Sequence, residues 1–95
     1  MTQQYLAGEL SLLLGELQAA VTNEAAQVEV ARLRQPAETG PRSALAFVVA
    51  RSLELADCLC WDSLARGDAE TFIHQAAIGA RLWEIGICSG LLEEK

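Results

Sequence analysis

Three cysteines and one histidine are the residues of this 95-residue sequence with the widest range of chemistry. Cys58 and Cys60 are separated by a single residue, which raises the question of a metal site. Inside a helix, residues two apart point about 200° away from each other, so both thiolates cannot bind one ion unless the helix unwinds. We therefore expect no bound metal, and we interpret these cysteines as small apolar core residues.

His74 is the only histidine, and a serine or cysteine nucleophile would need it as the general base. If a hairpin turns at Gly67-Asp68, His74 lies opposite Trp61 and within about one turn of Asp57. Asp57 falls beside the apolar side of its helix, which implies a polar partner. We interpret Asp57, Trp61 and His74 as a buried polar cluster or the edge of a small pocket. No nucleophile or oxyanion motif accompanies them, so we expect no enzyme activity and no cofactor.

Glycines form a second pattern. Gly86 and Gly90 have the GxxxG spacing, and Gly79 lies two turns before Gly86 on the same side, around Trp83. Glycine in a helix costs about 1 kcal/mol relative to alanine, so several of them favour a compensating close approach of two backbones. The sequence predicts close helix packing at the three glycines, with Trp83 filling the space between the helices.

Helices must position these residues, because the chain is rich in Ala, Leu and Glu and contains only two prolines. Hydrophobic residues make up 52% of it, which excludes a disordered tail. We predict an all-α fold, a three-helix antiparallel bundle that forms a single domain over residues 1–95. The expected elements are a long helix over about 2–34, a loop over 35–41, and a hairpin of two helices over about 42–66 and 68–92.

Three local signals set these boundaries. Pro36 denies a helix its backbone donor and is expected to end the first helix. Asp68, after Gly67, is a good N-cap for the last helix. Asn23 is also a possible N-cap, so a break of the first helix near residues 22–23 remains an alternative.

The last predicted helix is apolar on two sides. One stripe contains Phe72, Ala76, Ala80, Trp83, Ile87 and Leu91, and the other contains Ile78, Leu82, Ile85 and Leu92. A helix that is apolar on two sides must be covered on two sides, and a three-helix chain can cover only one of them. We expect Ile78, Leu82, Ile85 and Leu92 to form an interface between copies of the chain, most simply a homodimer.

The net charge and the positions of the charged residues disfavour two classes of function. The formal net charge is -6, and the first thirty-one residues contain four Glu and no base, which disfavours binding to nucleic acid. Charged residues interrupt each apolar run before it reaches the roughly 18 residues of a membrane span. The odd number of cysteines is typical of a reducing compartment, so we expect a cytoplasmic protein.

These observations favour a non-enzymatic protein-interaction, regulatory or assembly module that acts as a helical homo-oligomer, with another protein as the further candidate partner. The alternative is a small-molecule-binding or sensing protein with a pocket near Trp61, His74 and Trp83.

Overall fold

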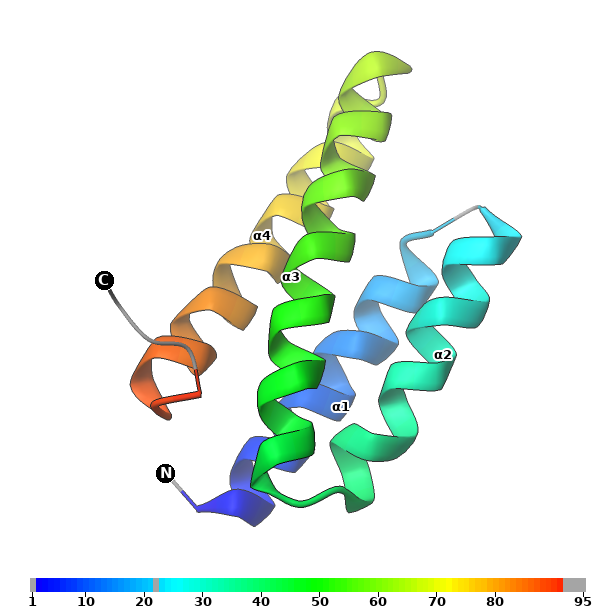
Figure 1. Cartoon of the computed structure of the whole chain (residues 1–95). Coiled ribbons are helices and arrows are strands. Elements are labelled where there is room, and N and C mark those ends of the chain that lie inside the picture. Colours follow the sequence, from blue (N-terminus) through cyan, green and yellow to red (C-terminus); the bar gives the residue numbers. More distant parts are fainter. Residues whose placement is uncertain (1, 22, 92–95) are drawn as a thin grey trace.

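The computed structural model describes residues 2–21 and 23–91. Over these residues the chain is all-α, with four helices: α1 (Gln3–Ala19), α2 (Glu24–Thr39), α3 (Arg42–Ala65) and α4 (Ala69–Cys88). They form two hairpins, α1 with α2 and α3 with α4, which pack against each other (Figure 1). The predicted count of three helices is wrong, because the segment expected to be one long helix over 2–34 is divided in two.

The division of that segment lies at an N-cap. The Asn23 side-chain oxygen accepts hydrogen bonds from the backbone N–H groups of Ala25 and Ala26, at 2.9 and 3.3 Å. This cap satisfies two donors that α2 leaves unpaired at its start. The structure therefore has the break that Asn23 offers as an alternative; Thr22, the other residue of that alternative, lies outside the described residues.

The predicted loop over 35–41 is also wrong, because α2 continues for a further turn beyond Pro36. Ala37 in this turn is fully buried, and the Gly40 N–H donates to the Pro36 carbonyl at 2.8 Å. Packing of the last turn on the core thus outweighs the donor lost at the proline. Only Gly40-Pro41 remains as the connection to α3. A Cβ atom at Gly40 would contact the Pro36 carbonyl and lie 2.9 Å from the Ala44 Cβ, so the tight connection requires glycine.

The α3–α4 turn lies at the predicted residues. Gly67 has a φ of 74°, a conformation that favours glycine, and the Asp68 carboxylate accepts from the Thr71 N–H at 3.1 Å. The hydrogen bond from Thr71 is the main cause that lowers the pKa of Asp68. At its other end α4 stops at Cys88, earlier than the predicted 92, and Gly90 follows with a φ of 77°.

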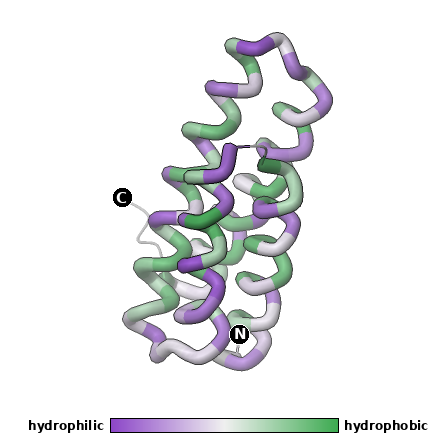
Figure 2. The backbone as a smooth tube through the Cα atoms, turned by 90° about the vertical axis from the view of Figure 1, so that its right-hand side faces the viewer, coloured by the Kyte–Doolittle hydropathy of each residue, from purple (hydrophilic) through white to green (hydrophobic). Residues whose placement is uncertain are grey.

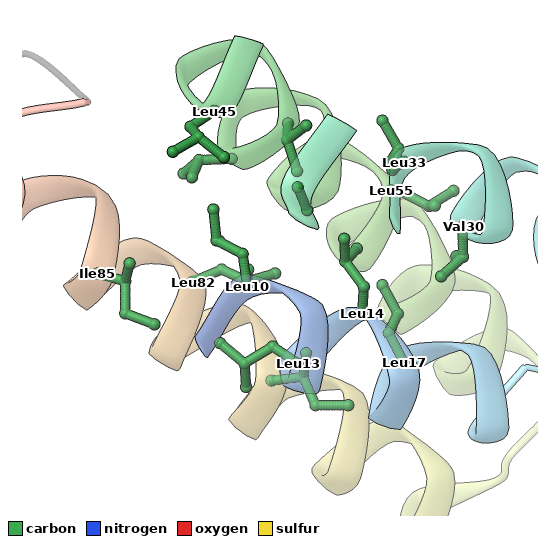
Figure 3. Close-up of a cluster of buried hydrophobic side chains, with 14 of the residues drawn as sticks. Leu10, Leu13, Leu14, Leu17, Val30, Leu33, Leu45, Leu55, Leu82 and Ile85 are labelled. Atoms are coloured by element: carbon green, nitrogen blue, oxygen red, sulfur yellow. The ribbon is translucent and has the colours of Figure 1, made fainter. Parts of the chain in front are cut away.

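One apolar core joins the hairpins. All four helices contribute to it, and Leu10 and Leu13 of α1 belong to the same cluster as Leu82 of α4 (Figure 3). Leu10, Leu14, Leu17, Val30, Leu45, Val48, Val49 and Leu82 are fully buried. Burial of each large aliphatic side chain stabilises the fold by about 1.5–3 kcal/mol, so this core dominates the stability of the bundle.

Two ion pairs connect the hairpins at the surface. Arg51 of α3 donates from Nε to the Glu29 carboxylate of α2 at 2.7 Å, and Arg81 of α4 pairs with Glu9 of α1 at 3.2 Å. The hydrogen bond to Glu29 is the largest cause that raises the pKa of Arg51. These partially exposed pairs orient the hairpins more than they stabilise them.

The α3–α4 hairpin extends beyond the connection between α1 and α2 (Figures 1 and 2). Gln75 marks the level at which α1 ends, because its side-chain amide donates to the Ala20 carbonyl at 3.4 Å. From this level to the turn, the hairpin has few neighbours. The side of α3 and α4 that faces away from the other hairpin is called the outer face below.

Candidate functional site

Helix α4 presents three distinct sides. The side that packs on the rest of the chain is buried: Gln75, Ile78, Leu82, Ile85 and Gly86. A second side is polar: Glu70, His74, Arg81 and Glu84. The third side is apolar although it is exposed or half-buried, and it is called the α4 outer stripe: Phe72, Ala76, Gly79, Ala80, Trp83 and Ile87. The helix is thus apolar on two sides, and the chain covers only one of them.

The covered side is the one that was expected to form the interface. Ile78, Leu82 and Ile85 are only 3%, 0% and 5% exposed, because α1 folds back against α4 within the same chain. Their assignment to an interface between copies is therefore corrected: they are intramolecular core. Leu92, the fourth residue of that set, lies outside the described residues. The uncovered apolar side of α4 is the α4 outer stripe.

A recess opens on the outer face between α3 and α4, with a volume of about 400 Å³. Small residues of both helices, Ala56, Ala76 and Gly79, contribute to its lining, whereas Trp61 and Leu64 remain 65% and 51% exposed. We call it the outer recess. Its complete lining is Leu53, Ala56, Asp57, Cys60, Trp61, Leu64, Phe72, Ala76 and Gly79. Asp57 is the one charged residue among these, so the recess suits an apolar occupant.

Trp83 lies one turn after Gly79 and is 54% exposed, so it does not fill a space between closely packed helices. A Cβ atom at Gly79 would lie 3.7 Å from the Ala56 Cβ, which is an ordinary contact that alanine could also make. Gly86 is buried, but Gly90 lies beyond the end of α4 with a positive φ. The predicted packing motif over these glycines is therefore not formed as one helical ridge, and Trp83 projects from the α4 outer stripe.

The predicted cluster of Asp57, Trp61 and His74 is not assembled. All three side chains are exposed. Asp57 and Trp61 line the outer recess, whereas His74 lies in a shallow depression with Ala19 and Ala20 of α1. The helical spacing of α4 places Phe72 on the outer side, in the lining of the outer recess, and His74 on the polar side. His74 is therefore separated from the recess that Asp57 and Trp61 line. A carboxylate at the open rim of a recess keeps its water, so Asp57 requires no buried partner.

The buried polar pair of this hairpin is a different one, which the sequence analysis missed. The Ser63 hydroxyl donates to the Gln75 side-chain oxygen at 2.8 Å and accepts from the Arg66 guanidinium at 3.3 Å. Gln75 is 1% exposed and Ser63 fully buried. One signal could have revealed the pair: Gln75 falls three residues before Ile78, on the buried side of α4.

The two neighbouring cysteines have different surroundings. Cys58 is exposed on the solvent side of α3, whereas Cys60 is half-buried in the lining of the outer recess. Burial is the main cause that raises the pKa of the Cys60 thiol, and the nearby negative charge of Asp57 adds to it. Within the described residues, no three His, Cys, Asp or Glu side chains are grouped so that they could hold a metal ion.

Comparison with known proteins adds no analogy. No protein-family model, curated protein or solved structure matches this chain. Among the described helices, none has the length and apolar composition needed to cross a membrane.

Proposed function

We propose that this chain is a non-enzymatic assembly module that self-associates through the outer face of its α3–α4 hairpin. The observation that carries the proposal is the exposure of large apolar side chains on one face: Trp61, Leu64 and Trp83 are each more than half exposed. Large apolar side chains exposed on one face are typical of interaction sites, and tryptophan is enriched in the centres of protein interfaces.

The charge of the chain restricts the partner. A net charge of -6 opposes contact with nucleic acid, whereas the outer recess itself contains one charged residue, Asp57. A second copy presents the same apolar outer face, so the outer faces of two copies can cover each other. Three free thiols suit a reducing compartment, so we place this assembly in the cytoplasm.

A second candidate function is the binding of a small apolar molecule in the outer recess. The volume of about 400 Å³ lies in the range of ligand sites. Of the three residues expected around a pocket, Trp61 lines this recess and His74 and Trp83 do not. A single carboxylate offers little to orient a small ligand, so the recess favours a bulky apolar side chain of a protein partner.

Cys58 and Cys60 provide an internal test of the assembly. We would measure the alkylation rate of each thiol by peptide mass spectrometry across micromolar to submillimolar protein concentrations, together with sedimentation velocity. Association through the outer face should protect Cys60 as the concentration rises and leave Cys58, on the solvent side of the same helix, unaffected. The matched thiol controls for any general effect of concentration.

Two outcomes would contradict the proposal. One is a monomer that persists at submillimolar concentration, and the other is association that leaves the Cys60 rate unchanged. A small molecule that protects Cys60 and quenches Trp61 fluorescence without a change in sedimentation would support the second candidate instead.

A further inference from the structure

Building on the proposed function, we infer that two copies pack α4 against α4 in antiparallel orientation, about a two-fold axis between Gly79 and Ala80. In this arrangement Trp83 of each copy enters the outer recess of the other. The recess is then a composite site, completed only by a side chain of the second copy.

The order of residues along the α4 outer stripe supports this arrangement. A two-fold interface uses the same patch on both copies, so the patch must be complementary to itself. When the stripe is reversed about the midpoint of Gly79 and Ala80, Trp83 falls opposite the partner's Ala76, and Ile87 falls opposite the partner's Phe72. The largest side chain thus meets a small one, and two small residues at the axis allow the helices to approach closely.

The position of the recess provides an independent argument. Its α4 lining, Phe72, Ala76 and Gly79, lies on the N-terminal side of the proposed axis, whereas Trp83 lies on the C-terminal side. Antiparallel copies bring the two together twice. A parallel pairing of α4 with α4 would instead align Trp83 with the partner's Trp83 and leave both recesses open.

The recess also offers the polar group that a buried indole requires. The N–H of a tryptophan in an interface usually finds a hydrogen-bond acceptor. Asp57 lies in the lining, and its carboxylate has no hydrogen bond or ion pair within the described part of the chain. The carboxylate is therefore available to accept from the incoming Trp83 of the partner.

The available area is sufficient for a specific but modest interface. The stripe from Phe72 to Ile87 spans about 24 Å, and two adjacent helices are about 20 Å wide, which gives a footprint of roughly 500 Å² per copy. The total of about 1,000 Å² reaches the lower limit of specific protein interfaces. We therefore expect reversible association rather than an obligate dimer.

Disulfide trapping tests the two-fold arrangement. In a variant that carries Cys58→Ser, Cys60→Ala and Cys88→Ser, a single cysteine is introduced as either Ala80→Cys or Ala69→Cys, both at exposed positions of α4. Cysteines at position 80 would lie next to the axis and should link the two copies under mild oxidation. Cysteines at position 69 would lie about 30 Å apart and should not.

A size exchange gives a second readout. Trp83→Ala should weaken association by about tenfold or more, as truncation of a central interface tryptophan commonly does. Ala76→Trp should also weaken it, because a second indole would compete with the partner's Trp83. The double variant Ala76→Trp/Trp83→Ala restores a large residue opposite a small one and should recover most of the affinity. Unchanged thermal denaturation would show that each variant folds.

The outcomes separate the two proposals. A dimer in which position 69 cross-links as readily as position 80, or in which the size exchange recovers nothing, would overturn the antiparallel arrangement and leave the assembly function standing. A chain that remains monomeric at submillimolar concentration would overturn both.

Discussion

The Ser63 hydroxyl of α3 donates to the Gln75 side-chain oxygen of α4 at 2.8 Å, and both side chains are almost completely shielded from solvent. Ser63→Ala should lower the free energy of unfolding by about 1–3 kcal/mol, because it leaves a buried acceptor unpaired. Chemical denaturation would measure the change. Ser43→Ala, at an exposed position of the same helix, should have little effect and serves as the control. Equal effects of the two substitutions would contradict a role for the buried pair.

Gly40→Ala should destabilise the protein, because its Cβ would contact the Pro36 carbonyl and Ala44 in the two-residue connection between α2 and α3. Gly8→Ala is a matched comparison: it lies within α1, and a Cβ there would have no neighbour within 4 Å. The second change should stabilise the protein by about 0.5–1 kcal/mol, since alanine is the better helix former. Opposite signs in urea denaturation are the expected result; a shared sign would argue against a tight connection at Gly40.

The N-cap at Asp68 should make stability depend on pH. The hydrogen bond from Thr71 lowers the pKa of Asp68 below its ordinary 3.8 in the folded state. A carboxylate with a depressed folded pKa stabilises the fold above its unfolded pKa, and this contribution is lost as the pH falls through the folded value. Melting temperatures of the wild type and Asp68→Ala should therefore differ at neutral pH and converge under acid conditions.

Asp68→Asn separates the two properties of this cap. Asparagine keeps the side-chain acceptor but does not titrate. The difference between the melting temperatures of Asp68→Asn and Asp68→Ala should therefore not change with pH. If the wild type and Asp68→Asn lose stability in parallel below the ordinary pKa of Asp, other carboxylates and not the cap dominate acid unfolding.

Cys60 should react with alkylating reagents more slowly than Cys58 in dilute protein at neutral pH, because burial and the charge of Asp57 raise its pKa. Asp57→Asn removes the charge but not the burial. It should therefore accelerate Cys60 labelling in part and leave the exposed Cys58 unaffected. Labelling rates in a monomeric sample provide the measurement, and no change at Cys60 would show that Asp57 does not influence this thiol.

Added salt should strengthen self-association. Each copy carries a net charge of -6, so two copies repel each other, and the interface proposed above contains few charges that salt could weaken. Sedimentation at low and moderate ionic strength would measure the effect. Dissociation on addition of salt would point to an interface made of ion pairs, in conflict with the apolar outer face.

The local signals of the sequence explain the hairpin better than the whole bundle. The all-α composition and the Gly67-Asp68 turn are evident without the structure, because they depend on residues next to each other in the chain. The continuation of α2 past Pro36 was not, since it depends on the burial of Ala37 by distant residues. The helix propensity of a short segment does not include its contacts with residues distant in the chain.

The candidate site shows the same division. The two apolar sides of α4 are visible in the sequence. Which side of α4 the chain itself covers depends on the break at Asn23. This break makes α1 a separate helix, and as a separate helix α1 can pack against α4. Ile78 was therefore assigned to the wrong surface, and Trp83 to a packing role that it does not have.

The arrangement of the helices as two hairpins also bears on the order of events in assembly. In each hairpin, the helices that pack together are consecutive in the chain, joined in the second hairpin by Arg66-Gly67-Asp68. Chains whose contacts are mainly local fold in microseconds to milliseconds, since little loop-closure entropy is lost before the contacts form. In the assembly proposed above, the folded protomer should therefore be present long before two copies meet, and the rate of assembly should scale with protein concentration.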